Sequence, residues 1–276
     1  MKKIKEPVYV KEEMSRPVKW FFGLPLVFVI YLMLSLIMPN AVSDYRASIA
    51  LNIISYIMLL LVFAMVVTRF LKFPFRKLLN ENSAFSFRNF FAGFVPMFLL
   101  GLGTTFLRMA LQPENFTFSL SSGWVTDFAL SLILVVLAAL MEELSCRSYV
   151  GYFLKDNLET RTRHKIPYCL ASAVLFTVLH FSNPEIRGAQ AFYAMAFYFV
   201  MGFALMAVTF RTRGIESALG IHIANNLVSA WFFTYENAAL TTNAIFTQSN
   251  NIGPLTLIQS VVCLVLSTLF VIAVSE

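Results

Sequence analysis

Long apolar runs alternate with short polar connections along almost the whole chain. Eight runs can be distinguished, at residues 20–38, 47–67, 90–107, from about 125 to the charged residues after 140, 166–181, 190–210, 215–235 and 255–274. An apolar run of about 20 residues can cross the hydrocarbon core of a bilayer as an α-helix. The pattern therefore predicts an all-α, polytopic membrane helix bundle with about eight transmembrane helices.

The charges in the connections predict how this bundle is oriented. From the N-terminus, alternate connections hold 6, 5, 5 and 2 of the 21 Lys and Arg residues, and the intervening ones share the remaining three. Cytoplasmic loops of membrane proteins carry an excess of Lys and Arg. We therefore expect an integral multi-pass protein of the cell membrane with both termini in the cytoplasm.

The runs divide the chain into four parts. Residues 1–19 form a basic cytoplasmic N-terminus, residues 20–124 hold helices one to three, residues 125–235 hold helices four to seven, and residues 236–276 hold a loop and helix eight. We expect the stretch after Ser145 to continue the fourth helix and then to lie at the membrane interface. Residues 182–185, which include a proline, should end the fifth helix.

Composition agrees with a membrane protein. The chain is 58% hydrophobic and 13% charged, whereas about 25% of the residues of a soluble domain are charged. The net charge of +6 could indicate nucleic acid binding in a soluble protein. Here the positive charges gather in alternate connections, so we expect the lipid bilayer, and no nucleic acid, as the partner.

Charged residues at the end of the fourth run carry the first candidate chemistry. Glu142, Glu143 and Arg147 follow the apolar residues directly, although an ionisable side chain inside a bilayer costs about 2.5–3.5 kcal/mol. Glu143 and Arg147 are four residues apart on a helix and can pair. Glu142 is rotated by about 100° from Glu143, so it remains available for chemistry.

Two further apolar runs also contain polar residues at helical spacing. Phe176 and His180 share one face of the fifth helix, and His222 and Asn226 share one face of the seventh. A single intramembrane histidine is usually a packed residue that bonds to a neighbouring helix. Three helices with such groups favour a common site instead, because buried polar groups need partners.

These groups together suit the activation of water and the stabilisation of an oxyanion. Glu142 would accept a proton from water, and His180 would orient that water or share its proton. His222 and Asn226 would donate hydrogen bonds to the oxyanion of a tetrahedral intermediate. This chemistry predicts hydrolysis of a peptide bond within the membrane.

A zinc site is an alternative use of the same residues. Two histidines and a carboxylate, here His180, His222 and Glu142, make a catalytic zinc set with an open fourth position. The HExxH spacing of many zinc proteases is absent after Glu142 and Glu143. The residues alone therefore leave both a metal-free and a zinc-dependent mechanism open.

Three motifs in this order resemble those of a known family. Glu-Glu-x-x-x-Arg at 142–147, Phe-x-x-x-His at 176–180 and His-x-x-x-Asn at 222–226 are similar to those of the CPBP (Abi) family of intramembrane proteases. That family includes CAAX prenyl endopeptidases and bacteriocin-processing or self-immunity proteins. The resemblance covers about residues 125–235, which would form the catalytic core.

The resemblance implies roles for individual residues. Glu142 and His180 would activate water, and His222 and Asn226 would stabilise the oxyanion. Supporting positions would be Glu143, Arg147 and Phe176. Both metalloprotease and metal-free, glutamate-dependent mechanisms have been assigned to the family; we favour the metal-free version, with zinc as the alternative.

The resemblance also implies a class of substrate. We expect a membrane-embedded or lipidated protein or peptide, with prenylated proteins included, that is cut near the cytoplasmic side. A second hypothesis is a non-catalytic membrane partner that regulates a sensor or transporter, or confers self-immunity to a bacteriocin by sequestering it. A third is a small transporter with a proton relay. The complete set of polar motif residues favours the protease.

Overall fold

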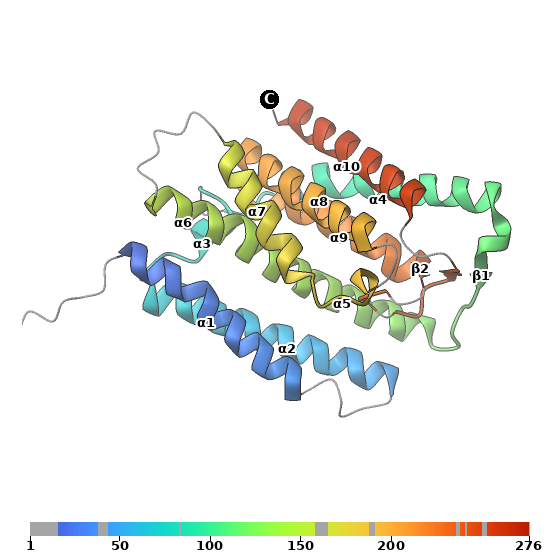
Figure 1. Ribbon diagram of the computed structural model, residues 1–276, viewed down its shortest axis with the longest axis horizontal. Helices are drawn as coiled ribbons and strands as arrows, with labels where there is room; N and C mark the ends of the chain where they lie inside the picture. The colour runs from blue at the N-terminus through green and yellow to red at the C-terminus, as the bar shows by residue number, and fades with distance from the viewer. Residues whose placement is uncertain are drawn as a thin grey trace, which may run out of the picture.

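The structure is a computed structural model that describes residues 16–37, 44–82, 84–157, 165–187, 191–235, 238–240, 242–249 and 253–275. Its long helices are α1 (Arg16–Ile37), α2 (Tyr45–Met65), α4 (Phe87–Leu111), α5 (Trp124–Glu143), α7 (Ile166–Leu179), α8 (Ala191–Thr212), α9 (Glu216–Leu227) and α10 (Pro254–Val274). Each predicted apolar run overlaps one of these helices. The predicted polytopic helical bundle is therefore confirmed (Figure 1).

Five helical segments of the described chain are long and apolar enough to cross a membrane. They are Tyr45–Phe70, Phe87–Leu111, Trp124–Leu154, Ala191–Thr212 and Pro254–Val274. The apolar helices Val18–Ile30 and Ile166–Leu179 are shorter. The chain is thus an integral membrane protein. The count of eight spans, the cell membrane and the cytoplasmic termini stay predictions, and the basic segment 1–15 lies outside the described residues.

The fourth helix does not end at its charged motif. After α5 the chain forms a π-helical turn, Leu144–Tyr149, and continues as α6 (Val150–Asn157), as the sequence predicted. Every residue from Glu143 to Val150 is buried, and the π turn packs against α7 and α8. Such turns occur frequently at functional sites. The charged motif therefore lies in the interior of the bundle.

The end of the seventh run differs from the predicted helix. After α9 a π-helical turn, Val228–Phe232, leads into strand β2 (Phe233–Tyr235). Strand β3 (Phe246–Gln248) pairs in parallel with β2 and antiparallel with β1 (Phe116–Phe118). Aromatic residues and threonine, which favour strands, dominate these segments. The two predicted polar loops thus meet in a small sheet at one end of the bundle (Figure 1).

Helix α9, which carries His222 and Asn226, is held by an unusually close contact with α4. A Cβ atom at Gly93 would lie 2.1 Å from the carbonyl oxygen of Ser217, and one at Gly220 would lie 2.2 Å from that of Phe90. Small residues allow such close approach of membrane helices. The contact fixes the depth of α9 in the bundle.

A buried carboxylate also fixes the start of α9. Glu216 is fully buried, and its Oε1 accepts hydrogen bonds from Asn80 Nδ2 at 2.7 Å and from the backbone N–H of Ser86 at 2.9 Å. These bonds connect α9 to the polypeptide that leads into α4. The turns of α9 that carry His222 and Asn226 therefore start from a defined position.

The close contact predicts the effect of a single methyl group. Gly220→Ala should lower the free energy of unfolding by about 1–3 kcal/mol, because the added carbon overlaps backbone that cannot move freely. Thermal unfolding in detergent measures this effect. Gly103→Ala on α4 is the matched control, since a Cβ there meets no atom within 4 Å. Equal unfolding temperatures for the two variants would contradict the packing argument.

Helix α1 is attached to the bundle by an aromatic anchor. The ring of Trp20 is fully buried and contacts Tyr149 with a centroid separation of 4.7 Å. The Tyr149 hydroxyl donates a hydrogen bond to the Trp20 carbonyl and accepts one from the Leu24 N–H at 3.0 Å. In Figure 1, α1 and α2 lie together along one side of the molecule. They form one wall of the central cavity.

Candidate active site

A cavity of about 770 Å³ lies inside the bundle. Residues from α1, α2, α4, α5, α7, α8, α9 and α10 line it. All four predicted catalytic residues, Glu142, His180, His222 and Asn226, are among them. The structure thus brings together side chains that are up to 84 positions apart in the sequence, from Glu142 to Asn226.

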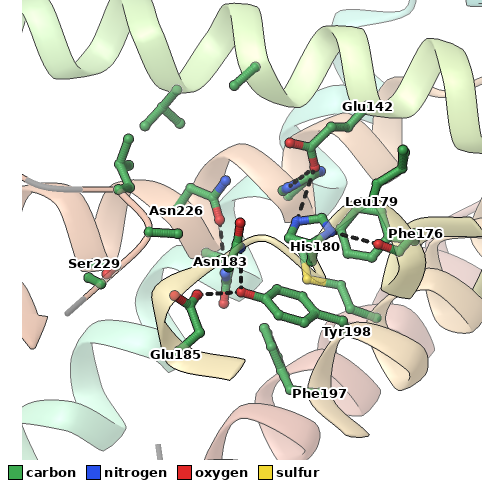
Figure 2. Close-up of a pocket in the computed structure, with 18 of the residues that line it drawn as sticks. Glu142, Phe176, Leu179, His180, Asn183, Glu185, Phe197, Tyr198, Asn226 and Ser229 are labelled. Carbon is green, nitrogen blue, oxygen red and sulfur yellow. Dashed lines mark hydrogen bonds and ion pairs between the residues drawn. The ribbon is translucent and has the colours of Figure 1, made fainter. Parts of the chain in front are cut away.

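The two imidazoles converge on the same carboxylate oxygen. Glu142 Oε2 lies 3.8 Å from His180 Nε2 and 3.6 Å from His222 Nε2. Figure 2 shows Glu142 above the His180 ring, with Asn226 beside them. The Glu142 side chain retains 23% of its exposure, whereas Glu143 next to it has none. Glu142 is therefore the more accessible of the two carboxylates, as expected for the one that the sequence left free of an ion pair.

Hydrogen bonds at the other ring nitrogens determine the histidine tautomers. His180 Nδ1 is 2.6 Å from the carbonyl oxygen of Phe176, and His222 Nδ1 is 2.7 Å from Glu143 Oε1. Both partners accept hydrogen bonds, so each Nδ1 carries a proton, and each Nε2 is the ring nitrogen that faces Glu142. Glu142 Oε2 is itself buried without a hydrogen-bond partner. This oxygen and the two Nε2 atoms thus face one another inside the cavity.

A buried ion pair supports this arrangement. Arg147 Nε lies 3.2 Å from Glu143 Oε2, and both side chains have no exposure, so the predicted pairing is present. The other Glu143 oxygen accepts the bond from His222, a link that the sequence did not predict. Arg147 also lies 4.4 Å from the centre of the Phe176 ring. Glu143 therefore orients His222, and Arg147 joins Glu143 to the helix of His180.

Asn226 enters the cavity wall from the last turn of α9. Its side-chain oxygen accepts a hydrogen bond from Asn225 Nδ2 at 3.1 Å. This bond occupies the oxygen of the Asn226 amide. The amide nitrogen, which is a hydrogen-bond donor, is not used by this bond. The arrangement is compatible with the predicted role of Asn226 as a hydrogen-bond donor.

Sequence reasoning missed a second polar group in the cavity. The ring of Tyr198 stacks on His180 with a centroid separation of 4.1 Å. Its hydroxyl donates a hydrogen bond to Glu185 Oε1 and accepts one from Asn183 Nδ2 at 3.0 Å. Asn183 and Glu185 lie in the predicted break after helix five, where their polarity was the available signal. Tyr198 lies within an apolar run, and nothing in the pattern distinguishes it.

The zinc alternative can be compared with this geometry. Glu142, His180 and His222 have the donor chemistry of a zinc site. Within the part of the chain that the structure describes, however, no group of three or more His, Cys, Asp or Glu residues is arranged to hold a metal ion. The residues as placed do not form a metal site, and zinc dependence stays a prediction.

The cavity thus places a carboxylate, two imidazoles and an amide together inside a bundle of apolar helices. The family model described as type II CAAX prenyl endopeptidase Rce1-like matches residues 124–228. The predicted resemblance to the CAAX prenyl endopeptidase (CPBP) family is therefore confirmed over this segment, which contains all three motifs.

One curated relative is similar over a longer stretch. "Uncharacterized protein YyaK" of Bacillus subtilis (strain 168) is 32% identical over 170 residues, which are 61% of this chain and 55% of the relative. The chain thus spans about half the length of this relative. No solved structure matches the chain. The likeness to this family supports a membrane protease in general. It identifies neither the substrate nor the catalytic residues.

Proposed function

We propose that the protein is an intramembrane endopeptidase of the CAAX prenyl protease type, which hydrolyses a peptide bond of a membrane-associated protein or peptide. The observation that carries this proposal is the convergence of His180 Nε2 and His222 Nε2 on Glu142 Oε2 inside the cavity. A water molecule bound against these atoms can transfer a proton directly to Glu142. The match of residues 124–228 to a protease family supports the same function.

The first step of the proposed mechanism is addition of water. Glu142 accepts one proton as the water oxygen attacks the carbonyl carbon, and His180 Nε2 accepts a hydrogen bond from the other O–H. The carbonyl oxygen becomes an oxyanion. Asn226 Nδ2 donates a hydrogen bond to it. His222 donates a second bond when both of its nitrogens are protonated, a state that the Glu143 carboxylate at Nδ1 stabilises.

Cleavage then completes the proton balance. The tetrahedral intermediate collapses, the C–N bond breaks, and Glu142 returns its proton to the leaving nitrogen. The products are a carboxylic acid and an amine, and Glu142 is again a carboxylate. Apolar residues of α1 and α2, among them Val27, Phe28 and Leu59, line the wall of the cavity. This wall favours a hydrophobic or lipidated substrate.

The proposal is tested by incubating purified wild-type protein and Glu142→Gln with a library of membrane peptides and prenylated peptides, with and without a strong zinc chelator. Mass spectrometry identifies the cleaved bonds. We expect cleavage by the wild type that persists with chelator and disappears in the variant. Loss with chelator would instead support zinc dependence. Cleavage by neither protein would favour the non-catalytic membrane partner.

A further inference from the structure

The candidate active-site cavity contains a second carboxylate to which the proposed mechanism gives no role. Glu185 lies in the 3₁₀ turn Pro184–Ile186, five residues after His180. It lines the same cavity as Glu142 and Asn226. Figure 2 shows Glu185 beyond the hydroxyl end of Tyr198, on the side of the cavity that also holds Ser229.

The hydrogen bonds of Glu185 are unevenly distributed between its two oxygens. The hydroxyls of Tyr198 and Tyr235 both donate to Oε1, the latter at 3.4 Å. Oε2 is buried and has no hydrogen-bond partner. A buried acceptor without a partner destabilises the protein, and a charged one does so more strongly. One oxygen of this carboxylate is thus held by the protein, and the other has no hydrogen-bond partner.

No cation of the described residues neutralises Glu185. Arg108, which also lines the cavity, donates hydrogen bonds to Thr256 at 2.8 Å and to Gln248. Arg187, two residues after Glu185, contacts the carbonyl oxygen of Ser182 at 3.4 Å. An unpaired carboxylate in a largely apolar cavity is costly, so it favours a ligand that brings its own positive charge.

The two phenols remain hydrogen-bond donors under ordinary conditions. Burial, followed by the charge of Glu185, raises the pKa of the Tyr235 phenol well above its ordinary value. Tyr198 in turn stacks on His180. A group bound at Glu185 would therefore be separated from His180 by one tyrosine ring and one hydrogen bond. That separation is within the reach of a residue close to the cleaved bond.

We propose that Glu185, held by Tyr198 and Tyr235, forms an anionic subsite that binds a Lys or Arg side chain of the substrate next to the cleaved peptide bond. This inference rests on the proposed protease function and adds a specificity-determining residue to it. The ammonium or guanidinium group would donate to Oε2, the oxygen that has no partner. A free peptide amino terminus has the same chemistry and must be distinguished by experiment.

The subsite can be tested by binding without turnover, in full-length protein that carries Glu142→Gln in nanodiscs. The probes are short fluorescent peptides of Ala and Leu with an N-terminal palmitoyl group, which removes the free amine. Each carries Lys at one internal position, and a matched set carries norleucine there. One further peptide has a free amino terminus and no Lys. Fluorescence anisotropy gives the dissociation constants.

We expect Lys at one position to tighten binding by about tenfold over norleucine, equivalent to about 1.4 kcal/mol. Adding Glu185→Gln should remove this preference, because it keeps the shape of the side chain and loses the charge. Adding Glu114→Gln, an exposed carboxylate outside the cavity lining, should preserve it. Glu185→Lys should instead favour peptides with Glu at that position.

Two results would overturn the subsite. One is a Lys preference that survives Glu185→Gln, and the other is the absence of a Lys preference at every position. Tighter binding of the free-amine peptide alone would assign the subsite to an amino terminus in place of a side chain. Cleavage by the wild type is measured separately on the same peptides, so failure of hydrolysis and failure of the subsite give different results.

Discussion

Replacement of Glu142 by Gln is expected to lower the rate of peptide hydrolysis by about 10²–10⁴-fold, the usual contribution of a general base. The amide of Gln has nearly the shape of the carboxylate, so the cavity should keep its form. It cannot accept the proton of the attacking water, however. His180 and His222 would then face an uncharged group in place of the carboxylate oxygen that they now approach at 3.8 and 3.6 Å.

The measurement is the initial rate on a validated membrane peptide, together with the unfolding temperature of each protein. Glu114→Gln is the control, because it makes the same change in charge at an exposed position. We expect Glu142→Gln to unfold near the wild-type temperature, so that lost activity reflects chemistry. Near-normal hydrolysis by the folded variant would show that Glu142 is not the base.

The other two motif helices should contribute to the same reaction. His180→Ala and Asn226→Ala are each expected to abolish detectable cleavage while the protein still inserts into the membrane. Removal of one oxyanion donor typically lowers kcat by about 10²–10³-fold, so Asn226→Ala should act on kcat with little effect on KM. An unchanged kcat in either variant would remove the assigned role at that position.

The second large effect is expected at Arg147. Arg147→Ala should lower the free energy of unfolding by about 3–5 kcal/mol, because it leaves the buried Glu143 carboxylate without its cationic partner. Both side chains are completely buried and lie 3.2 Å apart. Activity should fall as well, because Glu143 also orients His222. Thermal unfolding and cleavage assays measure the two effects, with Arg69→Ala at an exposed position as the control.

A double variant separates stability from catalysis at this ion pair. Glu143→Gln with Arg147→Met removes both charges, so part of the lost stability should return. Cleavage should remain low, because the neutral amide at position 143 supports a protonated His222 less well. Wild-type stability and activity in Arg147→Ala would exclude the pairing argument, and full activity in the double variant would exclude the orienting role of Glu143.

Local periodicity was sufficient to predict several features of this protein. The apolar runs located the long helices because a membrane segment must be apolar along its whole length. The spacing of four residues placed Glu143 with Arg147, Phe176 with His180 and His222 with Asn226, since residues at this distance share a helix face. The sequence likewise separated an available Glu142 from a Glu143 that pairs with Arg147.

The contacts between distant segments depended on the tertiary structure. The last residues of the seventh run became strand β2 because β3, which follows in the sequence, offered it a partner. Glycine adds nothing to a pattern of apolar and polar side chains, so the sequence did not single out Gly93 or Gly220. Each of them nevertheless lies against backbone of the other helix, and these contacts set the depth of α9. The bond between Glu143 and His222 likewise joins two helices whose relative position no local rule predicts.

The cavity shows most clearly what the sequence determined and what the tertiary structure decided. The sequence by itself determined which polar side chains are carried on membrane helices. Such residues are energetically unfavourable inside an apolar run, so they stand out in the sequence. Only the tertiary structure decided that two imidazoles meet on one oxygen of Glu142, and that Tyr198 connects His180 to Glu185. Those contacts depend on the rotation and depth of each helix, which packing between helices determines and local spacing does not.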